Sequence, residues 1–154
     1  MQSHEEVLSF LQSNPPRGDL DHKVPVLSIS PQSLASLNAV FRSKLLSGTP
    51  SMRGTLDSIK AFASIELGFD HVFDTTFARH MALREHVLEY EERSGVFGDK
   101  EGSLPMLASA CPGWICYAEK AHTEMLPLIS KTKSPQQVMG TLVKEWLGRK
   151  LGKR

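Results

Sequence analysis

The chain has 154 residues, of which 40% are hydrophobic and 23% are charged, and its formal net charge is +1. This length and composition predict one folded domain with a buried core. Because 18 Lys and Arg residues balance 17 Asp and Glu residues, no overall field favours nucleic acid or a membrane surface. No stretch approaches the ~18 consecutive apolar residues of a membrane span. We therefore expect neither nucleic acid nor a membrane as a partner.

The cysteine content and the first residues indicate the compartment. Two cysteines in a chain of this length do not form a disulfide framework. The first ten residues, MQSHEEVLSF, lack the basic-then-apolar order of a secretory signal. These features favour a reducing setting, either the cytosol or the nucleus.

The expected elements alternate between helices and strands. A short amphipathic helix from Ser3 or His4 to Gln12 precedes a polar, turn-rich linker that ends at residue 23. The remaining elements, in order, are a strand (24–30), two helices (32–46, 52–67), a strand (71–75), a helix (77–94), a polar loop (95–103), a strand (104–107), a helix from 112 to about 123, a short strand or irregular extended piece (125–130) and a helix (136–147). This alternation predicts an α/β fold with a mainly parallel sheet flanked by helices.

The expected domain organisation has three parts. Residues 1–23 form an N-terminal helix and linker, residues 24–147 form the α/β domain, and residues 148–154 form a locally basic tail. The sequence contains no internal repeat and no low-complexity run.

Each apolar strand ends in small polar residues and passes directly into a helix, three times with proline near the first helical position (Pro31, Pro112 and Pro135). In an open α/β sheet, ligands bind at the carboxyl ends of the strands, opposite helix N-termini. Seven residues would gather at that edge: Ser30, Thr75, Thr76, Ser109, Cys111, Ser130 and Ser134. The alternative is that such residues only cap helices.

Cys111 is the strongest candidate for chemistry in the chain. It directly precedes Pro112, so it would cap a helix N-terminus, where the backbone dipole favours a thiolate. A thiolate can act as a metal ligand or as a nucleophile. Cys116 has an apolar neighbourhood and is expected to be a buried packing residue. The two cysteines have no CxxC spacing, so the sequence supports neither a zinc site nor a thioredoxin-like site.

Other residue patterns carry less chemical information. The six His residues form no HxxxH or HExxH pair, and the chain has no GxGxxG or GxxxxGK[ST] loop. Glu85, Glu89 and Arg93 are spaced by helical turns, as on a solvated helix face. Trp114 and Trp146 are expected to be core or interface anchors.

Several strings resemble the large domain of the iron-only hydrogenase family. ASACPGW (108–114) is similar to the TSCCPGW typical of that family, and SPQQ (134–137) is similar to a later helix start. FDTTF is similar to the segment that precedes the first motif in that family. ASACPGW with CYAEK after it, and SHEE and SPQS upstream, extend the likeness to the hydrogenase-like cytosolic iron–sulfur assembly factors within the family. The resemblance covers nearly the whole chain.

The resemblance implies a role for individual residues. Cys111 matches a cysteine ligand of a [4Fe–4S] cluster, and Ala110 stands where hydrogenases have a proton-transferring cysteine. Glu89 and Ser130 match members of the hydrogenase proton path, and His86 replaces a glutamate of that path. Ser30, Pro31 and Gln32 fall on a loop beside the active-site cluster, where hydrogenases have a different small-residue pattern, and Gln136 matches another residue of the cluster pocket.

The departures from the family pattern set the expected function. Two cysteines are fewer than the four that a [4Fe–4S] cluster commonly takes. We therefore expect a fragment that binds no cluster stably by itself and contributes one ligand in the full-length protein. The resemblance implies a non-enzymatic component of cytosolic iron–sulfur protein assembly that docks targeting-complex proteins and delivers clusters to apoproteins. The alternatives are a catalytic iron-only hydrogenase domain and a cluster-free α/β interaction module.

Overall fold

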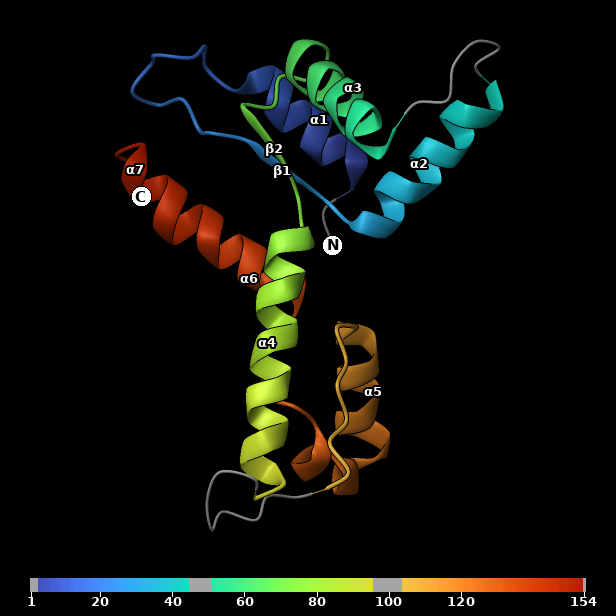
Figure 1. Ribbon diagram of the computed structural model, residues 1–154. Helices are drawn as coiled ribbons and strands as arrows, with labels where there is room; N and C mark the ends of the chain where they lie inside the picture. The colour runs from blue at the N-terminus through green and yellow to red at the C-terminus, as the bar shows by residue number, and fades with distance from the viewer. Residues whose placement is uncertain (1–2, 45–50, 96–103, 154) are drawn as a thin grey trace. The chain divides into compact units, whose positions relative to one another are not determined.

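A computed structural model describes residues 3–44, 51–95 and 104–153 (Figure 1). The chain divides into two compact units, residues 1–74 and 75–154. The first unit contains α1 (His4–Ser13), β1 (Val26–Ile29), α2 (Pro31–Lys44), α3 (Met52–Ile65) and β2 (His71–Asp74). The second contains α4 (Thr76–Arg93), α5 (Pro112–Ala121), the 3₁₀-helix η1 (Thr123–Leu128), α6 (Pro135–Thr141), the π-helix η2 (Leu142–Leu147) and α7 (Gly148–Lys150). The expected mixed α/β class is confirmed.

The first unit is organised around two parallel strands. β1 and β2 pair in register from Val26 with His71 to Ile29 with Asp74, and α2 and α3 lie between them in sequence. A buried cluster from both strands, α2, α3 and the turn before β2 forms the core: Ile29, Leu34, Ala63, Phe69 and Val72. α1 covers this cluster with Val7 and Leu11. The helical spacing of these two residues is the amphipathic pattern that the sequence showed.

Local sequence signals set the helix starts as expected. Pro31, Pro112 and Pro135 are the first residues of α2, α5 and α6. Ser3 caps α1 in a reciprocal capping box with Glu6, since each side chain accepts a hydrogen bond from the other residue's backbone N–H. Proline needs no N–H at a first helical position, and a serine oxygen satisfies a donor that the helix leaves unpaired.

The expected strand at 104–107 is wrong. In this part of the described chain, only Leu107 pairs, in an isolated parallel bridge with Ile129. Pro105 has no N–H to donate to a ladder, which limits regular pairing there. The sheet of the described residues therefore contains two strands, and the bridge is a separate contact within the second unit.

Two further expectations differ from the structure. Residues 123–128 form a 3₁₀-helix, so neither a strand nor an extended piece begins at 125, and only Ile129 joins the bridge. The last helix continues past residue 147 through Lys150, with π-type bonding from Leu142 to Leu147. The first residues of the expected basic tail are therefore helical. The expected end of the helix at 45–46 and most of the loop at 95–103 lie outside the described residues.

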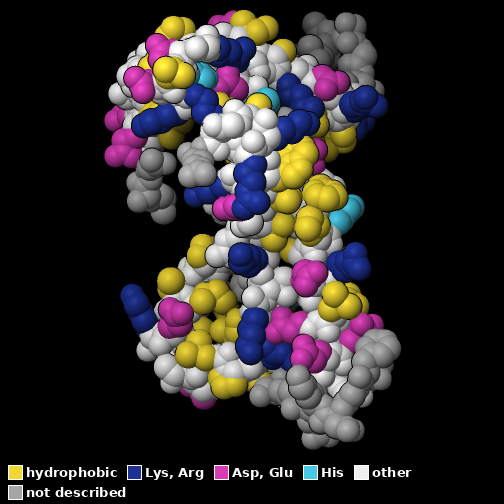
Figure 2. Space-filling view, turned by 90° about the vertical axis from the view of Figure 1, so that its left-hand side faces the viewer, with side chains coloured by type: hydrophobic (Ala, Val, Ile, Leu, Met, Phe, Trp, Pro, Cys, Tyr) yellow, Lys and Arg dark blue, Asp and Glu magenta, His cyan; other side chains and the backbone are white. Residues whose placement is uncertain are grey.

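Many large hydrophobic side chains remain exposed on the described surface (Figure 2). Trp146 is 62% exposed, with the Lys150 ammonium 5.1 Å from its ring centroid, so it is not a core anchor. Trp114 is half-buried. None of the helices in the described residues is both long and apolar enough to span a membrane.

Candidate functional site

Cys111 occupies the position that the sequence predicts for it, the N-cap of α5. Its side chain is exposed and makes no capping hydrogen bond. Its backbone N–H donates to the Ser109 hydroxyl at 3.1 Å, and its carbonyl accepts from the Ile115 N–H at 3.3 Å. These two bonds fix the backbone on both sides of the thiol and leave the sulfur open. The thiol is therefore available to an external ligand at a helix N-terminus.

Cys116 is exposed, so the expectation that it is buried is wrong. α5 buries Ala118, and Cys116 lies two residues before it, about 200° around the helix axis. An apolar neighbourhood in sequence does not bury a residue on the outward face of its helix. Cys111 precedes α5 as its N-cap, whereas Cys116 lies within the helix.

The described residues do not complete a site for an iron–sulfur cluster. No group of three or more His, Cys, Asp or Glu side chains among them could hold a metal ion together. A [4Fe–4S] cluster commonly takes four thiolates. Cys111 therefore fits as one ligand of such a cluster and not as a whole site.

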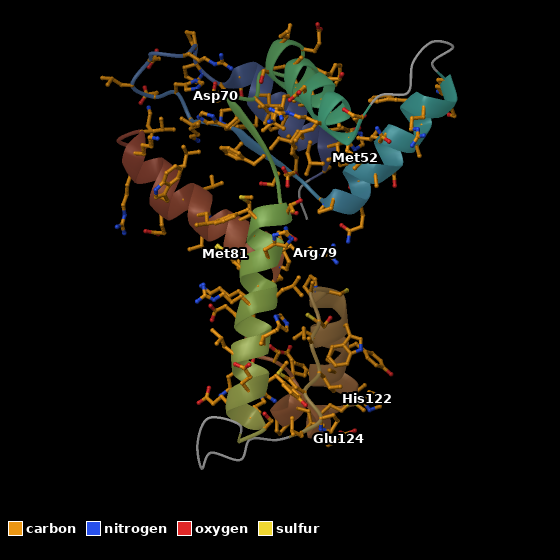
Figure 3. All side chains as sticks on the ribbon, in the orientation of Figure 1. Met52, Asp70, Arg79, Met81, His122 and Glu124 are labelled. Atoms are coloured by element: carbon orange, nitrogen blue, oxygen red, sulfur yellow. The ribbon has the colours of Figure 1, made fainter. Side chains whose placement is uncertain are left out.

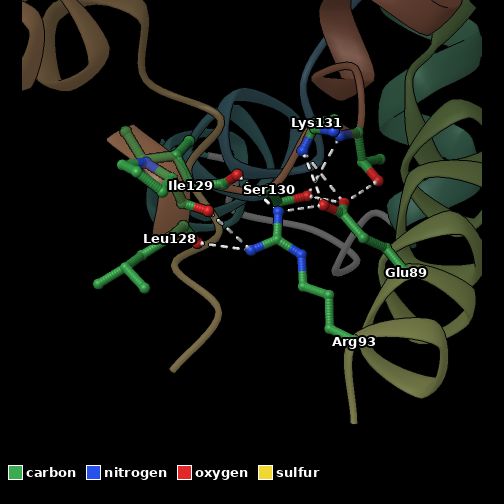
Figure 4. A network of polar contacts seen from close by, with 8 residues as sticks. Glu89, Arg93, Leu128, Ile129, Ser130 and Lys131 are labelled. Atoms are coloured by element: carbon green, nitrogen blue, oxygen red, sulfur yellow. Dashed lines mark hydrogen bonds and ion pairs between the residues drawn. The ribbon is translucent and has the colours of Figure 1, made fainter. Parts of the chain in front are cut away.

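A second polar centre lies on α4, around the Glu89 carboxylate (Figure 4). The hydroxyls of Ser130 and Thr132 donate to it, the latter at 3.2 Å. The Lys131 N–H donates to both carboxylate oxygens at 3.0 and 3.1 Å, and Arg93 donates at 2.5 Å. The Glu89 side chain is only 14% exposed. One carboxylate thus binds three consecutive residues of the segment that follows η1.

Arg93 holds the last two residues of η1 and the residue that follows it (Figure 4). Its guanidinium donates to the carbonyls of Pro127, Leu128 and Ile129 at 3.3, 3.2 and 2.8 Å. Its side chain is 10% exposed. The interpretation of the Glu89–Arg93 pair as part of a solvated helix face is therefore wrong. Helical spacing is the same for exposed and buried pairs, and the burying segment lies some forty residues away in sequence.

The hydrogen bonds determine the charge state of Glu89. Burial alone would raise the pKa of its carboxyl group, but the bonds from Ser130, Lys131, Arg93 and Thr132 lower that pKa from 4.5 to about 2. Glu89 is therefore an anion at neutral pH. It is fixed by donors on every side, which suits a structural anchor better than a group that repeatedly gains and loses a proton.

The segment held by Glu89 and Arg93 is also paired to the chain that leads to Cys111. The Leu107 N–H donates to the Leu128 carbonyl, and the Ser130 N–H donates to the Leu107 carbonyl, both at 2.8 Å. Leu107 precedes Cys111 by four residues. α4 side chains, the segment after η1 and the approach to Cys111 therefore form one connected arrangement within the second unit.

The resemblance also assigns roles to His86, Ser30 and Gln136, and the contacts described for these residues are local. Nδ1 of His86 lies 2.6 Å from the Ala82 carbonyl of its own helix. Ser30 belongs to the first unit, where its hydroxyl caps the start of α2 by accepting from the Ser33 N–H. Gln136 is exposed on the first turn of α6. The structure therefore shows local roles for these residues, and their place beside a cluster stays a prediction.

The seven polar residues expected at one edge belong to both units, and their gathering stays a prediction. Ser109 and Cys111 are joined by a hydrogen bond, and Ser130 binds Glu89. Ser134 caps α6 by accepting from the Gln137 N–H at 3.3 Å. The described contacts therefore support capping for several members, which was the simpler alternative.

Sequence comparison relates the chain to cytosolic iron–sulfur proteins. It is 49% identical to a cytosolic Fe-S cluster assembly factor, NAR1, of Cryptococcus neoformans over 98% of its length and 24% of that protein. It is 52% identical to the cytosolic Fe-S cluster assembly factor narfl of Xenopus tropicalis over 93% of its length and 29% of that protein. The chain thus spans between 24% and 29% of the length of these two relatives.

The chain also resembles solved structures of [FeFe]-hydrogenases. An [FeFe]-hydrogenase studied for oxygen inactivation of its H cluster matches 97% of the chain with a TM-score of 0.69 at 27% identity. An apo [FeFe]-hydrogenase of Chlamydomonas reinhardtii matches with a TM-score of 0.67. The chain covers 35% and 34% of these two proteins. The family model described as "Iron only hydrogenase large subunit, C-terminal domain" matches residues 23–154. The chain belongs to this family.

Proposed function

We propose that this chain is part of a cytosolic iron–sulfur assembly factor in which Cys111 supplies one ligand of a [4Fe–4S] cluster. In the same proposal, the chain offers a docking surface to proteins of the cytosolic iron–sulfur targeting machinery and performs no catalysis. Identities of 49% and 52% to proteins named as assembly factors support this role and the cytosolic location. The names of these two relatives say cytosolic and do not mention the nucleus.

The observation that carries the proposal is the exposure of Cys111 at the start of α5. The thiol is open, backbone hydrogen bonds fix its position, and it lies within the matched family region. Since the chain covers only 24% to 29% of these two relatives, we propose that the remaining ligands belong to the rest of the full-length protein. When bound, the cluster would supply redox-active or transferable iron and sulfide.

The alternative function is hydrogen catalysis, which the solved neighbours favour because they are hydrogenases. One feature of this chain counts against it: Ala110 provides no acid or base next to Cys111, at the position where the resemblance implies a proton-transferring cysteine in hydrogenases.

The test compares two cysteines of one helix in the full-length protein. After anaerobic reconstitution, Cys111→Ser is expected to lower bound iron and acid-labile sulfide by about four atoms each per protein. Cys116→Ser is the matched control, since Cys116 is also exposed on α5, and it is expected to leave both values unchanged. Unchanged iron in Cys111→Ser would refute the ligand role and favour a cluster-free interaction module.

A third variant tests the enzymatic alternative. Ala110→Cys places a thiol where the resemblance implies the hydrogenase proton donor. We expect neither the unmodified protein nor this variant to evolve hydrogen from reduced methyl viologen. Hydrogen evolution by the unmodified protein would overturn the non-enzymatic assignment.

A further inference from the structure

The chain that leads to Cys111 is held four residues before the thiol. The Leu107 N–H donates to the Leu128 carbonyl, and the Ser130 N–H donates to the Leu107 carbonyl, both at 2.8 Å. The Cys111 N–H donates to the Ser109 hydroxyl at 3.1 Å. A displacement of Leu107 therefore reaches Cys111 through three intervening residues, one of which is bonded to Cys111 itself.

The element that follows α5 is fastened to the end of that helix. The His122 N–H donates to the Ala118 carbonyl at 2.9 Å, and the Met125 N–H donates to the His122 carbonyl at 3.0 Å, so α5 passes into η1 through one residue. Nε2 of His122 lies 3.1 Å from the Tyr117 hydroxyl, and Nδ1 lies 3.2 Å from the Glu124 carboxylate (Figure 3). The position of η1 is thus coupled to the position of α5.

Two side chains of α4 hold both of these neighbours of Cys111 (Figure 4). Arg93 donates to the Leu128 carbonyl at 3.2 Å, and this carbonyl also accepts from the Leu107 N–H. Glu89 accepts from the Ser130 hydroxyl, and the Ser130 N–H donates to the Leu107 carbonyl. Each residue that pairs with Leu107 is therefore itself bonded to one member of the Glu89–Arg93 pair.

The Glu89–Arg93 pair is well suited to fix these segments. The two side chains are 14% and 10% exposed and are joined at 2.5 Å. Hydrogen bonds to charged groups are about twice as strong as neutral ones, and removal of one shielded charge leaves the other without its partner. The bonds to Leu128 and Ser130 therefore depend on both members of the pair.

The thiol itself has no side-chain support in the described contacts. The Cys111 side chain makes no capping hydrogen bond, so its place is set by the backbone on either side. Groups behind a metal ligand orient that ligand, and their loss typically lowers metal affinity 10- to 100-fold. For Cys111, the corresponding support reaches the ligand through Leu107 and through η1.

We propose that Glu89 and Arg93 are positioning residues that hold the Cys111 thiol in the place where a cluster takes it as a ligand. This inference rests on the proposed function of Cys111 and deepens it by naming the residues that set the ligand's position. The resemblance relates Glu89 and Ser130 to a hydrogenase proton path. In this chain the two residues act through a fixed bond between them.

The experiment follows iron release from the reconstituted full-length protein to a ferrous chelator without oxygen. Glu89→Gln is expected to speed release about tenfold, because Glu89 acts on Cys111 through the backbone rather than directly. Ser130→Ala removes one hydroxyl donor but keeps the backbone bond to Leu107, and it is expected to speed release about threefold. Glu85→Gln, at an exposed position one turn away on α4, is the control and is expected to release iron at the unmodified rate.

Two further measurements separate positioning from a general loss of stability. The electron paramagnetic resonance spectrum of the reduced protein reports the surroundings of the iron, and we expect it to change in Glu89→Gln and in Ser130→Ala. Asp70 is the matched carboxylate of the first unit, at the turn before β2, where it holds the loop of residues 14–23 through Arg17 (Figure 3). Asp70→Asn is expected to change neither the spectrum nor the rate of release.

The two proposals fail separately. Full iron in Cys111→Ser refutes the ligand role, and the positioning inference with it. If Cys111→Ser loses iron while Glu89→Gln and Ser130→Ala release it at the unmodified rate, only the positioning inference is overturned. Faster release with an unchanged spectrum, or equally fast release from Asp70→Asn, would also overturn it. If Glu89→Gln fails to fold, Ser130→Ala, which keeps the ion pair, decides the result.

Discussion

Asp70 in the first unit and Glu89 in the second unit each hold an irregular segment with one shielded carboxylate. Asp70, 10% exposed, is paired with Arg17 of the loop that it holds and lies 2.7 Å from Nε2 of His22. Glu89, 14% exposed, binds hydroxyls and a backbone N–H of its segment and is paired with Arg93 of its own helix. The two units thus use similar groups in different arrangements.

The difference lies in the cationic partner. Arg93 is 10% exposed, whereas Arg17 is 63% exposed. Ion pairs in water contribute little, whereas a desolvated charge becomes costly once its partner is removed. Glu89 should therefore contribute most of the stability of the segment that it holds. The stability of the loop held by Asp70 should instead be shared among several weaker contacts.

The largest expected effect comes from neutralising each carboxylate. Glu89→Gln leaves Arg93 buried without its counter-charge and is expected to destabilise residues 127–132 by about 3 kcal/mol. Asp70→Asn is expected to destabilise the 14–23 loop by about 1–2 kcal/mol, because Arg17 returns to water. Native-state hydrogen exchange measures each unit separately. Glu85→Gln, at an exposed position one turn from Glu89, should change stability by at most about 0.5 kcal/mol.

Equal losses for Glu89→Gln and Asp70→Asn would contradict this comparison. They would show that burial of the cation does not decide the energy of these anchors.

Acid should release the Glu89 anchor within a defined pH window. Because the pKa of Glu89 is lowered from 4.5 to about 2 on folding, its stabilisation is complete above about pH 4.5 and is lost as the pH falls toward 2. The loss amounts to at most about 3 kcal/mol. Hydrogen exchange of residues 127–132 at pH 2 to 6 measures it, and Glu89→Gln should flatten the profile. An unchanged profile in that variant would assign the acid sensitivity to another group.

Replacing each arginine by lysine should have a smaller effect than neutralising the carboxylate with which it is paired. Arg17→Lys keeps a charge near Asp70 at a solvated position and is expected to change stability by about 0.5 kcal/mol. Arg93→Lys should cost about 2 kcal/mol, because lysine lacks the planar fork that reaches three carbonyls and Glu89 together. Urea unfolding of both variants measures the difference. A similar cost for both would reject the proposed contrast.

Much of the local structure could be predicted from the sequence. Proline and serine signals placed the starts of α1, α2, α5 and α6, and they placed Cys111 at a helix N-terminus. These signals act within one turn of helix, so they do not depend on the rest of the fold. Family strings such as ASACPGW place the candidate ligand Cys111 within the region that the family model matches, and its ligand role stays a prediction.

Exposure and long-range pairing could not be predicted in the same way. The apolar neighbours of Cys116 predicted burial, yet the residue is exposed. The helical spacing of Glu89 and Arg93 predicted solvent exposure, yet both side chains are buried by residues 127–132. In place of the strand expected at 104–107, the structure has one bridge between Leu107 and Ile129. A strand forms only where a neighbouring segment offers backbone N–H and C=O groups along its whole length.

The sequence by itself determined where helices begin, which thiol opens a helix and which family the chain belongs to. The tertiary structure decided which charges are shielded, that residues 123–128 form a 3₁₀-helix and that the 14–23 loop is bound to Asp70. Capping acts between residues three or four apart, whereas Arg17 lies 53 residues from Asp70 and Glu89 lies 41 residues from Ser130. Contacts over such separations form only when the whole chain pays the entropy of bringing them together.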